Sequence, residues 1–470
     1  MGLPLVVTDP ALLEGYLCDA SNVRGRAEAL VRPKTAEEVA AVVAHCQARG
    51  IPLTPTAGRT STTGASVPDG GWLLSTEGLR DIVAIGHDTA TAEGGVMLGA
   101  FQDAIEATGR FYPPDPTSRR ECSLGGSIVC NASGARSFRY GPTRRWIEAV
   151  QVVTPTGEVH EVVRGQPAPA DWPTVRWPEP ALKTAAGYAP SPSWLDLLIG
   201  SEGTLGVVTR ATVRLTDLPA DVIGLVAFFP DRVAAVRFVE VARRAARDDP
   251  RGALSPRCLE YYDRACLAVA ADRLGWVPAG AGAALFCEQE VAAGADPDVH
   301  LEAWLGALSE AGALADDTVL ATDAPGRERL YALRHAIPAG INERAVANGM
   351  RKVGTDLAVP HAALDRMMTA YEAAPVDAVL FGHIGDDHLH LNLLPRTPAE
   401  LEQALAYYDE LARLAVSLGG TVSAEHGIGK LKRRHLAWMV GDEVLASFRA
   451  LKDHVDPAGI LARGNVFEPL

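Results

Sequence analysis

The spacing of apolar and polar positions predicts both helices and strands in the first half of the chain. Residues 36–49 carry apolar side chains at helical spacing, and Thr35 with Glu38 forms a capping box before them. Gly50 follows where a left-handed cap is favoured. Three further segments have the β-branched, apolar composition of strands: 51–54, 147–154 and 207–215.

The pattern changes at about Asp217, where apolar strands such as 223–229 begin to alternate with amphipathic helices such as 232–247. A helix from Thr397 to Leu418 ends at two glycines, and glycine becomes frequent again after it. We therefore expect three parts: a first domain of residues 1–216, an α+β domain of residues 217–420, and a C-terminal segment of residues 421–470. Residues 165–192, rich in Pro and Trp, are expected to form a long surface excursion.

Composition narrows the class of protein. The chain has 470 residues and a formal net charge of -14, which suits two domains and disfavours nucleic acid as a partner. No apolar stretch approaches the length of a membrane span, and Met1–Pro10 lacks the features of a secretion signal. The seven cysteines include no CxxC pair. We therefore expect all seven to be small core residues of a protein that works in the reducing cytoplasm.

Three glycine-rich stretches stand out: residues 56–64, 124–134 and 200–206. Binding a pyrophosphate needs several inward-pointing backbone N–H groups, and small residues let the chain approach closely. No Lys-Ser/Thr pair follows the first stretch, and no GxGxxG opens a helix, so neither a Walker loop nor a Rossmann fingerprint is present. One such stretch is usually structural; three in one half of the chain favour a bound nucleotide.

Histidines are concentrated in a predicted hairpin at residues 377–395. After the turn, His388, His390 and Asn392 alternate with leucines and should share one face of a half-buried strand. With a four-residue loop, Gly385 to His388, His383 would lie directly opposite His390. Directly paired residues have Cβ atoms about 5 Å apart, a suitable span for two imidazoles to bind one cation.

Glu425 and His426 form a second polar pair, among small residues with no apolar pattern to explain them. Two histidines and a glutamate with an open position are a common catalytic metal set. The alternative is that each histidine is a hydrogen-bonded polar residue near the surface.

Taken in order, these motifs resemble the FAD-linked D-2-hydroxyacid dehydrogenases of the vanillyl-alcohol-oxidase superfamily, over nearly the whole chain. The group includes D-lactate dehydrogenases, the glycolate oxidase FAD subunit and D-2-hydroxyglutarate dehydrogenase. The resemblance implies a two-part PCMH-type FAD-binding domain and an α+β cap domain with an antiparallel sheet, the C-terminal segment returning to the first domain. The matching stretches are 55–64, 113–118, 124–134, 140–141, 200–207, 382–392, 423–430 and 456–461.

The resemblance also implies which residues hold the cofactor. Because the first glycine loop contains Arg59 and no histidine, non-covalent FAD is expected. The pyrophosphate would lie against Pro55, Thr56, Ala57, Gly58, Arg59, Thr60, Ser61, Gly125 and Gly126. The rest of the FAD would lie against Pro114, Ser118, Asn131, Gly134, Glu202, Gly203, Val207 and Asn465.

For the chemistry, the resemblance implies that His383, His390 and Glu425 bind zinc or manganese and that His426 is the base. Arg334, Lys352 and Asn392 would bind the substrate.

Three positions depart from the family pattern. Gly-Asp-Gly-Asn is common in the hairpin turn, but Asp387 and His388 replace its last two residues here, so His388 is a competing ligand. Residues 462–464 replace Asn-Pro-Gly, which weakens the transfer of FAD contacts there. Pro338 stands where some relatives hold substrate with a threonine, which weakens a 2-hydroxyglutarate assignment.

The expected reaction is FAD-dependent oxidation of a small D-2-hydroxy acid to its 2-keto acid, by metal-assisted deprotonation and hydride transfer to flavin N5. Three alternatives stay open: a zinc-dependent hydrolase, a non-catalytic FAD subunit that passes electrons within a larger oxidase, and a metal-free oxidation of alditols or phenols. The electron acceptor, whether quinone, cytochrome or electron-transferring flavoprotein, is open. So are a homodimeric state and membrane association through that acceptor.

Overall fold

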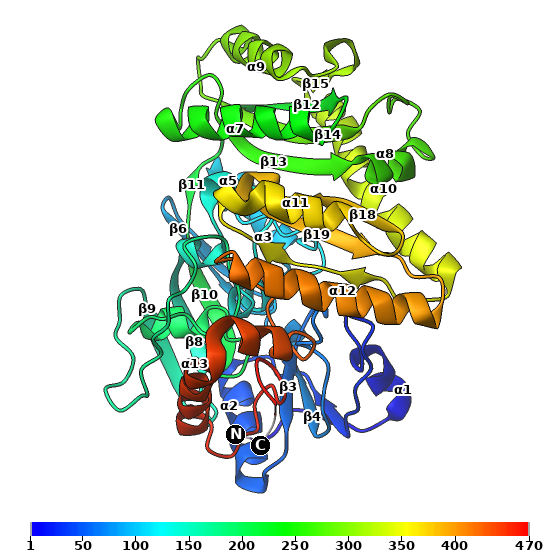
Figure 1. Ribbon diagram of the computed structural model, residues 1–470. Coiled ribbons are helices and arrows are strands. Elements are labelled where there is room, and N and C mark those ends of the chain that lie inside the picture. The colour runs from blue at the N-terminus through cyan, green and yellow to red at the C-terminus, as the bar shows by residue number, and fades with distance from the viewer. Residues whose placement is uncertain (1, 469–470) are drawn as a thin grey trace. The chain divides into compact units, whose positions relative to one another are not determined.

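The computed structural model describes residues 2–468, which form two compact units (Figure 1). Unit 1 contains the chain up to Gly134, then Gly141–Leu218, and the chain from Val422 onward. Unit 2 contains Pro219–Thr421 and also the short segment Ala135–Tyr140. The sequence placed the divisions after 216 and after 420, and contained no sign that residues 135–140 leave the first unit.

A four-stranded sheet in unit 1 has the order β1-β2-β4-β3, with β2 and β3 parallel to β4. Helix α2 (Ala36–Arg49) packs on it through Val39, Val42, Val43 and Cys46, all fully buried. Burial of this apolar face is the main contribution that stabilises the helix against the sheet. The strands are β1 (Val6–Val7), β2 (Ala29–Val31), β3 (Leu53–Thr56) and β4 (Trp72–Ser75); α1 (Pro10–Leu13) follows β1.

Helix α2 has the caps that its sequence predicts, with one difference. The Thr35 hydroxyl accepts from the Glu38 amide at 3.2 Å, and Gly50 is left-handed with φ 62°. The Glu38 carboxylate accepts from the amide of Lys34 at 2.7 Å, not from that of Thr35. The glutamate of the capping box therefore accepts from an amide one residue earlier than expected. The helix that begins after Thr397 shows the same difference, since Glu400 accepts from the amide of Arg396.

A second sheet of unit 1 has five antiparallel strands in the order β5-β6-β10-β8-β9, and β7 pairs with β11 in a third, two-stranded sheet. The strands predicted at 147–154 and 207–215 are confirmed as β8 (Ile147–Val153) and β10 (Val207–Arg214). The other elements of the unit are β5 (Ile82–Ile85), β6 (Thr89–Glu93), β7 (Arg110–Phe111), β9 (Val159–Val163), β11 (Thr216–Asp217), α3 (Leu98–Glu106), α4 (Leu124–Val129), α6 (Trp194–Leu198) and α13 (Arg433–Val455).

Residues 165–192 contain no helix or strand, as expected, but they are not all at the surface. Residues 185–189 are buried, and Tyr188 has no exposed area. Its hydroxyl is hydrogen-bonded to Thr204 at 2.7 Å. Proline and tryptophan indicated irregular backbone correctly, but they carry no information about burial.

Unit 2 is built on one large antiparallel sheet in the order β15-β12-β14-β13-β18-β19-β16, with β17 paired to β19. The predicted strand and helix at 223–229 and 232–247 are confirmed as β12 and α7. The strands are β12 (Asp221–Phe229), β13 (Pro256–Asp263), β14 (Ala283–Val291), β15 (Val319–Ala321), β16 (Val353–Gly354), β17 (Leu357–Ala358), β18 (Ala378–Gly382) and β19 (His388–Leu393). The helices are α5 (Ser137–Tyr140), α7 (Arg232–Asp248), α8 (Arg264–Ala271), α9 (Pro297–Ala311), α10 (Ala324–Asn348), α11 (Leu364–Glu372) and α12 (Pro398–Ser417).

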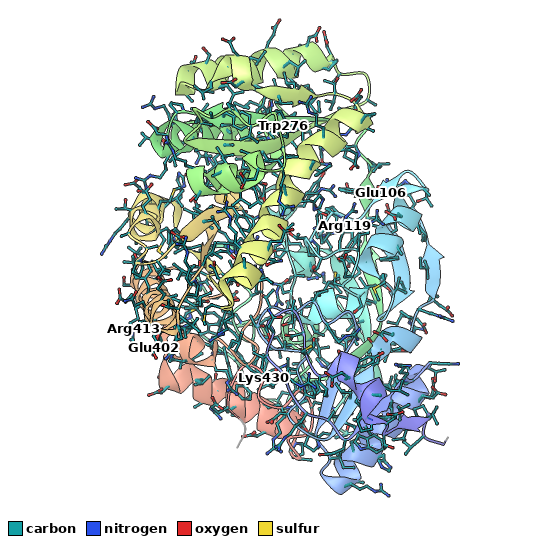
Figure 2. The ribbon with its side chains drawn as sticks, turned by 90° about the vertical axis from the view of Figure 1, so that its right-hand side faces the viewer. Glu106, Arg119, Trp276, Glu402, Arg413 and Lys430 are labelled. Atoms are coloured by element: carbon teal, nitrogen blue, oxygen red, sulfur yellow. The ribbon has the colours of Figure 1, made fainter. Side chains whose placement is uncertain are left out.

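Helices cover this sheet on both faces. Phe229 of β12 packs on Phe238 of α7, which packs on Trp304 of α9. The preceding residue, Phe228, belongs to the core formed with α8 and α10, and Trp276 (Figure 2) packs edge-on against it, with ring centroids 6.3 Å apart. Since neighbouring strand residues point to opposite faces, this fixes α7 and α9 on one face and α8 and α10 on the other.

Two expectations drawn from composition can be compared with the structure. No helix within residues 2–468 combines the length and the apolar character needed to cross a membrane. All seven cysteines are free thiols, and five are buried. Cys130 is partly buried and Cys18 is exposed, so the core assignment is wrong for Cys18.

Candidate functional site

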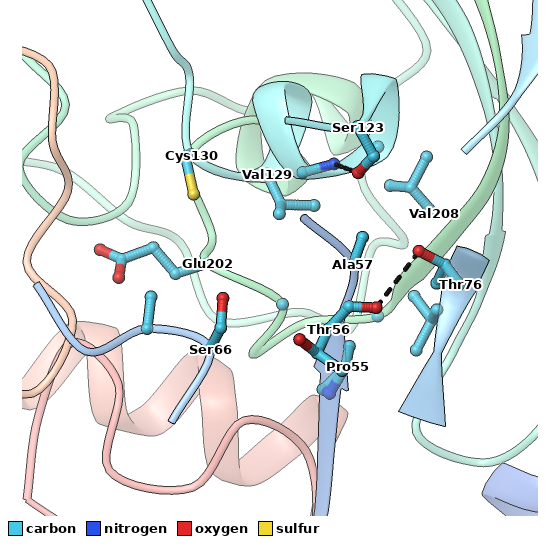
Figure 3. Close-up of a pocket in the computed structure, with 16 residues that line it drawn as sticks. Pro55, Thr56, Ala57, Ser66, Thr76, Ser123, Val129, Cys130, Glu202 and Val208 are labelled. Atoms are coloured by element: carbon cyan, nitrogen blue, oxygen red, sulfur yellow. Dashed lines mark hydrogen bonds between the residues drawn. The ribbon is translucent and has the colours of Figure 1, made fainter. Parts of the chain in front are cut away.

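A cavity lies in unit 1 (Figure 3), and the empty space in and around it, open solvent included, is about 560 Å³. It is lined by the end of β3, the start of α4 and the loop of residues 200–206. The lining includes eight residues that the sequence predicts: Pro55, Thr56, Ala57, Gly125, Gly126, Glu202, Gly203 and Val207. It also includes eight that sequence reasoning missed: Ala65, Ser66, Thr76, Ser123, Val129, Cys130, Gly206 and Val208. Only Cys130, Gly206 and Val208 are direct neighbours of a predicted residue, so the glycine stretches located the cavity but not its extent.

The second glycine stretch begins with helix α4, whose first turn contains Gly125 and Gly126. Its amides already donate within the protein, Gly125 to the Gly94 carbonyl at 2.8 Å and Gly126 to the Ser123 hydroxyl at 3.1 Å. A Cβ on Gly125 would lie 2.9 Å from the Gly94 oxygen. These glycines therefore permit close packing of the helix beside the cavity, and inward-pointing N–H groups are not the reason for them.

Thr56 provides a polar atom suited to a ligand of this cavity. Its Oγ1 is buried and has no hydrogen-bond partner within residues 2–468, while its carbonyl accepts from the Thr76 hydroxyl at 3.4 Å (Figure 3). Leaving a buried hydroxyl unsatisfied costs about 1–3 kcal/mol. A bound group with polar atoms at this point would remove that penalty, and an FAD fits the requirement.

Several predicted cofactor residues do not line the cavity and have structural contacts instead. Arg59 pairs with Glu77 at 2.9 Å and lies over the Tyr16 ring at 4.4 Å. Asn131 has φ 46° and accepts from the Arg144 amide at 3.0 Å. A Cβ at Gly58 or Gly134 would lie within 2 Å of a neighbouring carbonyl oxygen. The other predicted residues outside the lining are Thr60, Ser61, Pro114, Ser118 and Asn465.

Glu202 and Asn465 link the glycine loops to the C-terminal segment. The buried Glu202 carboxylate accepts from the amides of Ile428 at 2.6 Å and Gly429 at 2.7 Å. Burial raises the pKa of Glu202 to about 6, against the effect of these two bonds. Asn465 donates to the carbonyls of Ala65 and Glu202, and Lys430 (Figure 2) donates to Asn465 at 2.7 Å. The loop of residues 423–430 is thus anchored beside the cavity.

Glu425, the proposed carboxylate ligand, lies on that anchored loop. Its Oε2 is 2.8 Å from Lys183 Nζ and 3.3 Å from the Ser133 hydroxyl, and its Oε1 is 3.4 Å from His426 Nε2. Lys183 was missed because it lies in the irregular segment 165–192, where no periodicity or motif marks one residue. The structure therefore brings the predicted Glu425 and His426 together and adds a cation.

The hairpin of unit 2 has a different register from the one predicted. Phe381 pairs with His390, so His390 does not lie directly opposite His383. Residues 384–386 form a 3-10 turn, and Asp387 is left-handed with φ 55°. The His388 amide then donates to the His383 carbonyl at 3.2 Å, which makes His383 and His388 the facing pair and leaves His390 diagonal to His383.

Three imidazoles meet on one face of this hairpin. The ring centroids of His383 and His390 are 5.5 Å apart, and His388 lies 5.3 and 4.4 Å from them. Their nitrogen atoms lie within 4.8 Å of one another. All residues of β19 are buried, so the expectation of a half-buried strand and the alternative of surface histidines are both wrong.

Each imidazole has an acceptor oxygen of unit 2 within 3.1 Å of one ring nitrogen. His383 Nδ1 lies 2.6 Å from Glu260, His390 Nδ1 lies 3.1 Å from the Thr355 carbonyl, and His388 Nε2 lies 2.8 Å from Asp356. Glu260 and Asp356 are buried. The sequence prediction of the site includes neither residue, although a carboxylate between the apolar residues Leu259 and Tyr261 of β13 was a usable signal for Glu260.

The three predicted substrate residues also lie in unit 2. Asn392 is buried in β19, two positions after His390 on the same face. Arg334 is half-buried in α10, and its charge acts on the buried Tyr262. Lys352 is exposed just before β16. Asn392 therefore adjoins the histidine cluster along the strand.

Solved structures show the fold of the chain. The chain resembles p-cresol methylhydroxylase with substrate bound at a TM-score of 0.74, with 16% identity over 99% of this chain and 94% of that one. It resembles alkyldihydroxyacetonephosphate synthase at a TM-score of 0.70, over 97% of this chain and 81% of that one, again with 16% identity. The fold is the two-domain PCMH-type FAD-binding fold, as the sequence predicted.

Family comparisons identify the chain more closely. Residues 218–466 match the model for the C-terminal domain of FAD-linked oxidases, and residues 27–162 match an FAD-binding domain. The chain belongs to the FAD-linked oxidases, and it is an FAD-dependent enzyme.

Curated relatives match over nearly the full length. The chain is 31% identical to D-2-hydroxyglutarate dehydrogenase of Xanthomonas citri pv. viticola, over 98% of this chain and 94% of that protein. It is 29% identical to glycolate oxidase subunit GlcD of Bacillus subtilis (96% and 92%) and 29% identical to D-lactate dehydrogenase of Anaerostipes hadrus (98% and 94%).

Proposed function

We propose that this protein oxidises a small D-2-hydroxy acid to the 2-keto acid in a centre that also binds zinc or manganese. The observation that carries the metal proposal is the buried cluster of three imidazoles, each with an acceptor oxygen of unit 2 within 3.1 Å of one ring nitrogen. Relatives named for lactate, glycolate and 2-hydroxyglutarate support the substrate class. These acids share one reacting unit, a carboxylate beside a secondary or primary alcohol.

FAD held without a covalent bond is the proposed electron acceptor in the protein. Bound FAD would supply the acceptor for the hydride of C2 and the two electrons that the hydride carries. The chain's part is to hold and align it, through the cavity residues and the Thr56 hydroxyl. Asn131, Gly134 and Asn465 act in this proposal by fixing the loops around the cofactor.

His383, His390 and Glu425 are the proposed metal ligands. Nitrogen and carboxylate donors of this kind suit zinc, and a carboxylate also suits manganese. A bound divalent metal lowers the pKa of a coordinated hydroxyl, as it lowers that of water from about 15.7 to about 7. Lys183 and Ser133 both donate to Oε2 of Glu425 and hold the carboxylate in place. The other oxygen, Oε1, is the one proposed to bind the metal.

The remaining residues have distinct tasks. His426 accepts the proton of the substrate hydroxyl, since imidazole is a suitable base near neutral pH. Arg334 binds the substrate carboxylate through its fork of N–H donors, and Lys352 provides a second cation. Asn392 donates to the substrate from β19. The hydroxyl proton thus goes to His426 and the C2 hydride to the flavin, which balances the two-electron oxidation.

An anaerobic screen tests the proposal. The purified yellow protein is mixed with D- and L-2-hydroxy acids, and bleaching of the flavin absorbance is followed by stopped flow. One or more D-acids should bleach it and their L-isomers should not. His426→Asn should slow bleaching about 10²–10⁴-fold, while H87N, at an exposed histidine, should not.

The outcomes separate the parts of the proposal. Bleaching by L-acids only, or by none, contradicts the substrate class. Unchanged bleaching in H426N contradicts the base assignment, and full activity after chelation contradicts the metal. Adding quinone, cytochrome or electron-transferring flavoprotein to the reduced protein then shows which acceptor restores the yellow form.

A further inference from the structure

We propose that His388 is a third imidazole ligand of the metal and that Asp356 is the residue that positions it. The inference rests on the proposed metal centre and extends it to a position where the resembled family often has asparagine. An asparagine offers an amide oxygen or nitrogen, whereas His388 offers a nitrogen lone pair that binds zinc well.

The strand geometry places His388 among the other two imidazoles. His388 and His390 are two positions apart in β19, so their side chains leave the same face. Their ring centroids are 4.4 Å apart, which is closer than either ring is to His383. The ligand nitrogens of all three lie within 4.8 Å of one another. One cation can therefore be shared by three imidazoles as readily as by two.

The surroundings of His388 resemble those of the two histidines already proposed, because each imidazole has an acceptor oxygen within 3.1 Å of one ring nitrogen. A histidine that binds a metal usually donates its other ring N–H to a carboxylate or carbonyl, which fixes its tautomer and orientation. His383 has Glu260, His390 has the Thr355 carbonyl, and His388 has Asp356 at 2.8 Å. Because Nε2 of His388 faces the Asp356 carboxylate, the proposal assigns Nδ1 of His388 to the metal, whereas the other two histidines would use Nε2.

The burial of His388 and Asp356 also supports a role of His388 as a metal ligand. His388 has no exposed area and the Asp356 side chain is 1% exposed. Burying a carboxylate is expensive unless positive charge compensates it. A divalent cation among the rings would bring that charge close to both Asp356 and Glu260. A purely structural His388–Asp356 pair is the competing explanation, and it predicts no change in metal binding.

A third imidazole has a chemical consequence. Imidazole ligands favour zinc over manganese, and carboxylate or water ligands suit manganese better. With His388 as a ligand, the protein should prefer zinc strongly. Replacing His388 by asparagine, the residue of the resembled pattern, should move the preference toward manganese.

X-ray absorption at the zinc edge of the full-length, FAD-loaded protein tests the inference without any substitution. It counts imidazoles around the metal, and three are expected. H388N, H388Q and D356N are then compared with the wild type for metal content and for zinc affinity by chelator competition. D356N should weaken zinc binding about 10–100-fold, and H388N and H388Q should weaken it at least as much because a ligand itself is lost. H335N, at an exposed histidine of α10, should match the wild type.

The results distinguish the two levels of the proposal. If the wild-type protein binds zinc through two imidazoles, or if H388N keeps the wild-type zinc affinity, His388 is not a ligand although the metal centre stands. If the wild-type protein binds neither zinc nor manganese, the metal centre itself is wrong and this inference falls with it. If H388N does not fold, the imidazole count of the wild type still decides.

Discussion

The ammonium of Lys183 lies 2.8 Å from the carboxylate of Glu425, 242 positions further along the chain. Both side chains are nearly buried, 4% and 9% exposed. Around them, Ala185 donates its amide to the Ser423 carbonyl at 2.9 Å. The irregular segment 165–192 therefore holds the loop that carries Glu425, although nothing in its own pattern indicates such a role.

Lys183→Met should destabilise unit 1 strongly. Methionine keeps the length of the side chain but removes the charge, and the Glu425 carboxylate is left in a buried position without its cation. Breaking a buried pair by removing one partner costs about 3–5 kcal/mol. We expect a lower unfolding temperature in calorimetry of the flavoprotein after metal removal. K183M/E425Q should recover most of the loss, because both charges are then gone.

The double variant is the decisive comparison. If K183M/E425Q is as unstable as the sum of K183M and E425Q, the two charges do not depend on each other and the pair has no energetic coupling. K34M, at an exposed lysine of the same unit, controls for the loss of a positive charge alone.

Glu202 should make the stability of unit 1 depend on pH. Burial raises its pKa from an ordinary 4.5 to about 6. Between these values the folded protein binds the proton and the unfolded chain does not, so stability falls as pH rises from 4.5 to 6. At about 1.4 kcal/mol per pKa unit the fall is about 2 kcal/mol. Unfolding temperatures of the wild type and Glu202→Gln across this range measure the difference.

The glutamine variant should lack that part of the pH dependence and also lose one of the two bonds to residues 428 and 429, since its NH₂ group cannot accept. E121Q, at an exposed carboxylate, should follow the wild-type profile. Parallel profiles for the wild type and E202Q would mean that Glu202 does not titrate in this range.

Local patterns in the sequence located much of the fold. Capping residues gave the start of α2 at Thr35, and apolar runs gave β8, β10, β12 and α7 within one or two residues. These features depend on neighbours along the chain, which a sequence displays directly. The resemblance then supplied the domain architecture, which no local pattern contains.

The sequence was less informative where the structure depends on a turn or a distant partner. The assumption of a four-residue hairpin loop placed His383 opposite His390 instead of His388, because register is set by turn geometry. Lys183, Glu260 and Asp356 escaped notice because each acts on a residue far away in the sequence. Gly125 and Gly126 were found for the wrong reason, since close packing and inward-pointing amides both require glycine.

Thr56→Val tests whether the cavity hydroxyl serves the cofactor. Valine has nearly the same shape but no hydroxyl, so the protein without flavin should be as stable as the wild type or slightly more so, because a buried unsatisfied group is removed. FAD should bind about 5–100-fold more weakly, the equivalent of losing a 1–3 kcal/mol contact. Flavin release in equilibrium dialysis measures the affinity, with Thr54→Val in the same strand as control. Equal FAD affinity in T56V and the wild type would contradict this role.

Arg243 of α7 should stabilise the hairpin turn that carries the histidines. Its Nη1 lies 2.9 Å from the buried carboxylate of Asp387, whose other oxygen is 2.8 Å from His361. Arg243→Met leaves Asp387 buried with less positive charge around it, and we expect a loss of about 2–3 kcal/mol in unit 2. Metal affinity should fall as well, since the turn positions His383 and His388.

Adding Asp387→Gly to R243M should restore stability. Glycine removes the buried charge and relieves the left-handed backbone at φ 55°, which disfavours most other residues by roughly 1 kcal/mol. The double variant R243M/D387G should therefore unfold at a higher temperature than R243M alone, and R237M, on an exposed position of the same helix, should resemble the wild type. The opposite outcome, in which the double variant is the least stable of the set, would contradict this role of Arg243. The Asp387 carboxylate would then stabilise the hairpin mainly through its contact with His361.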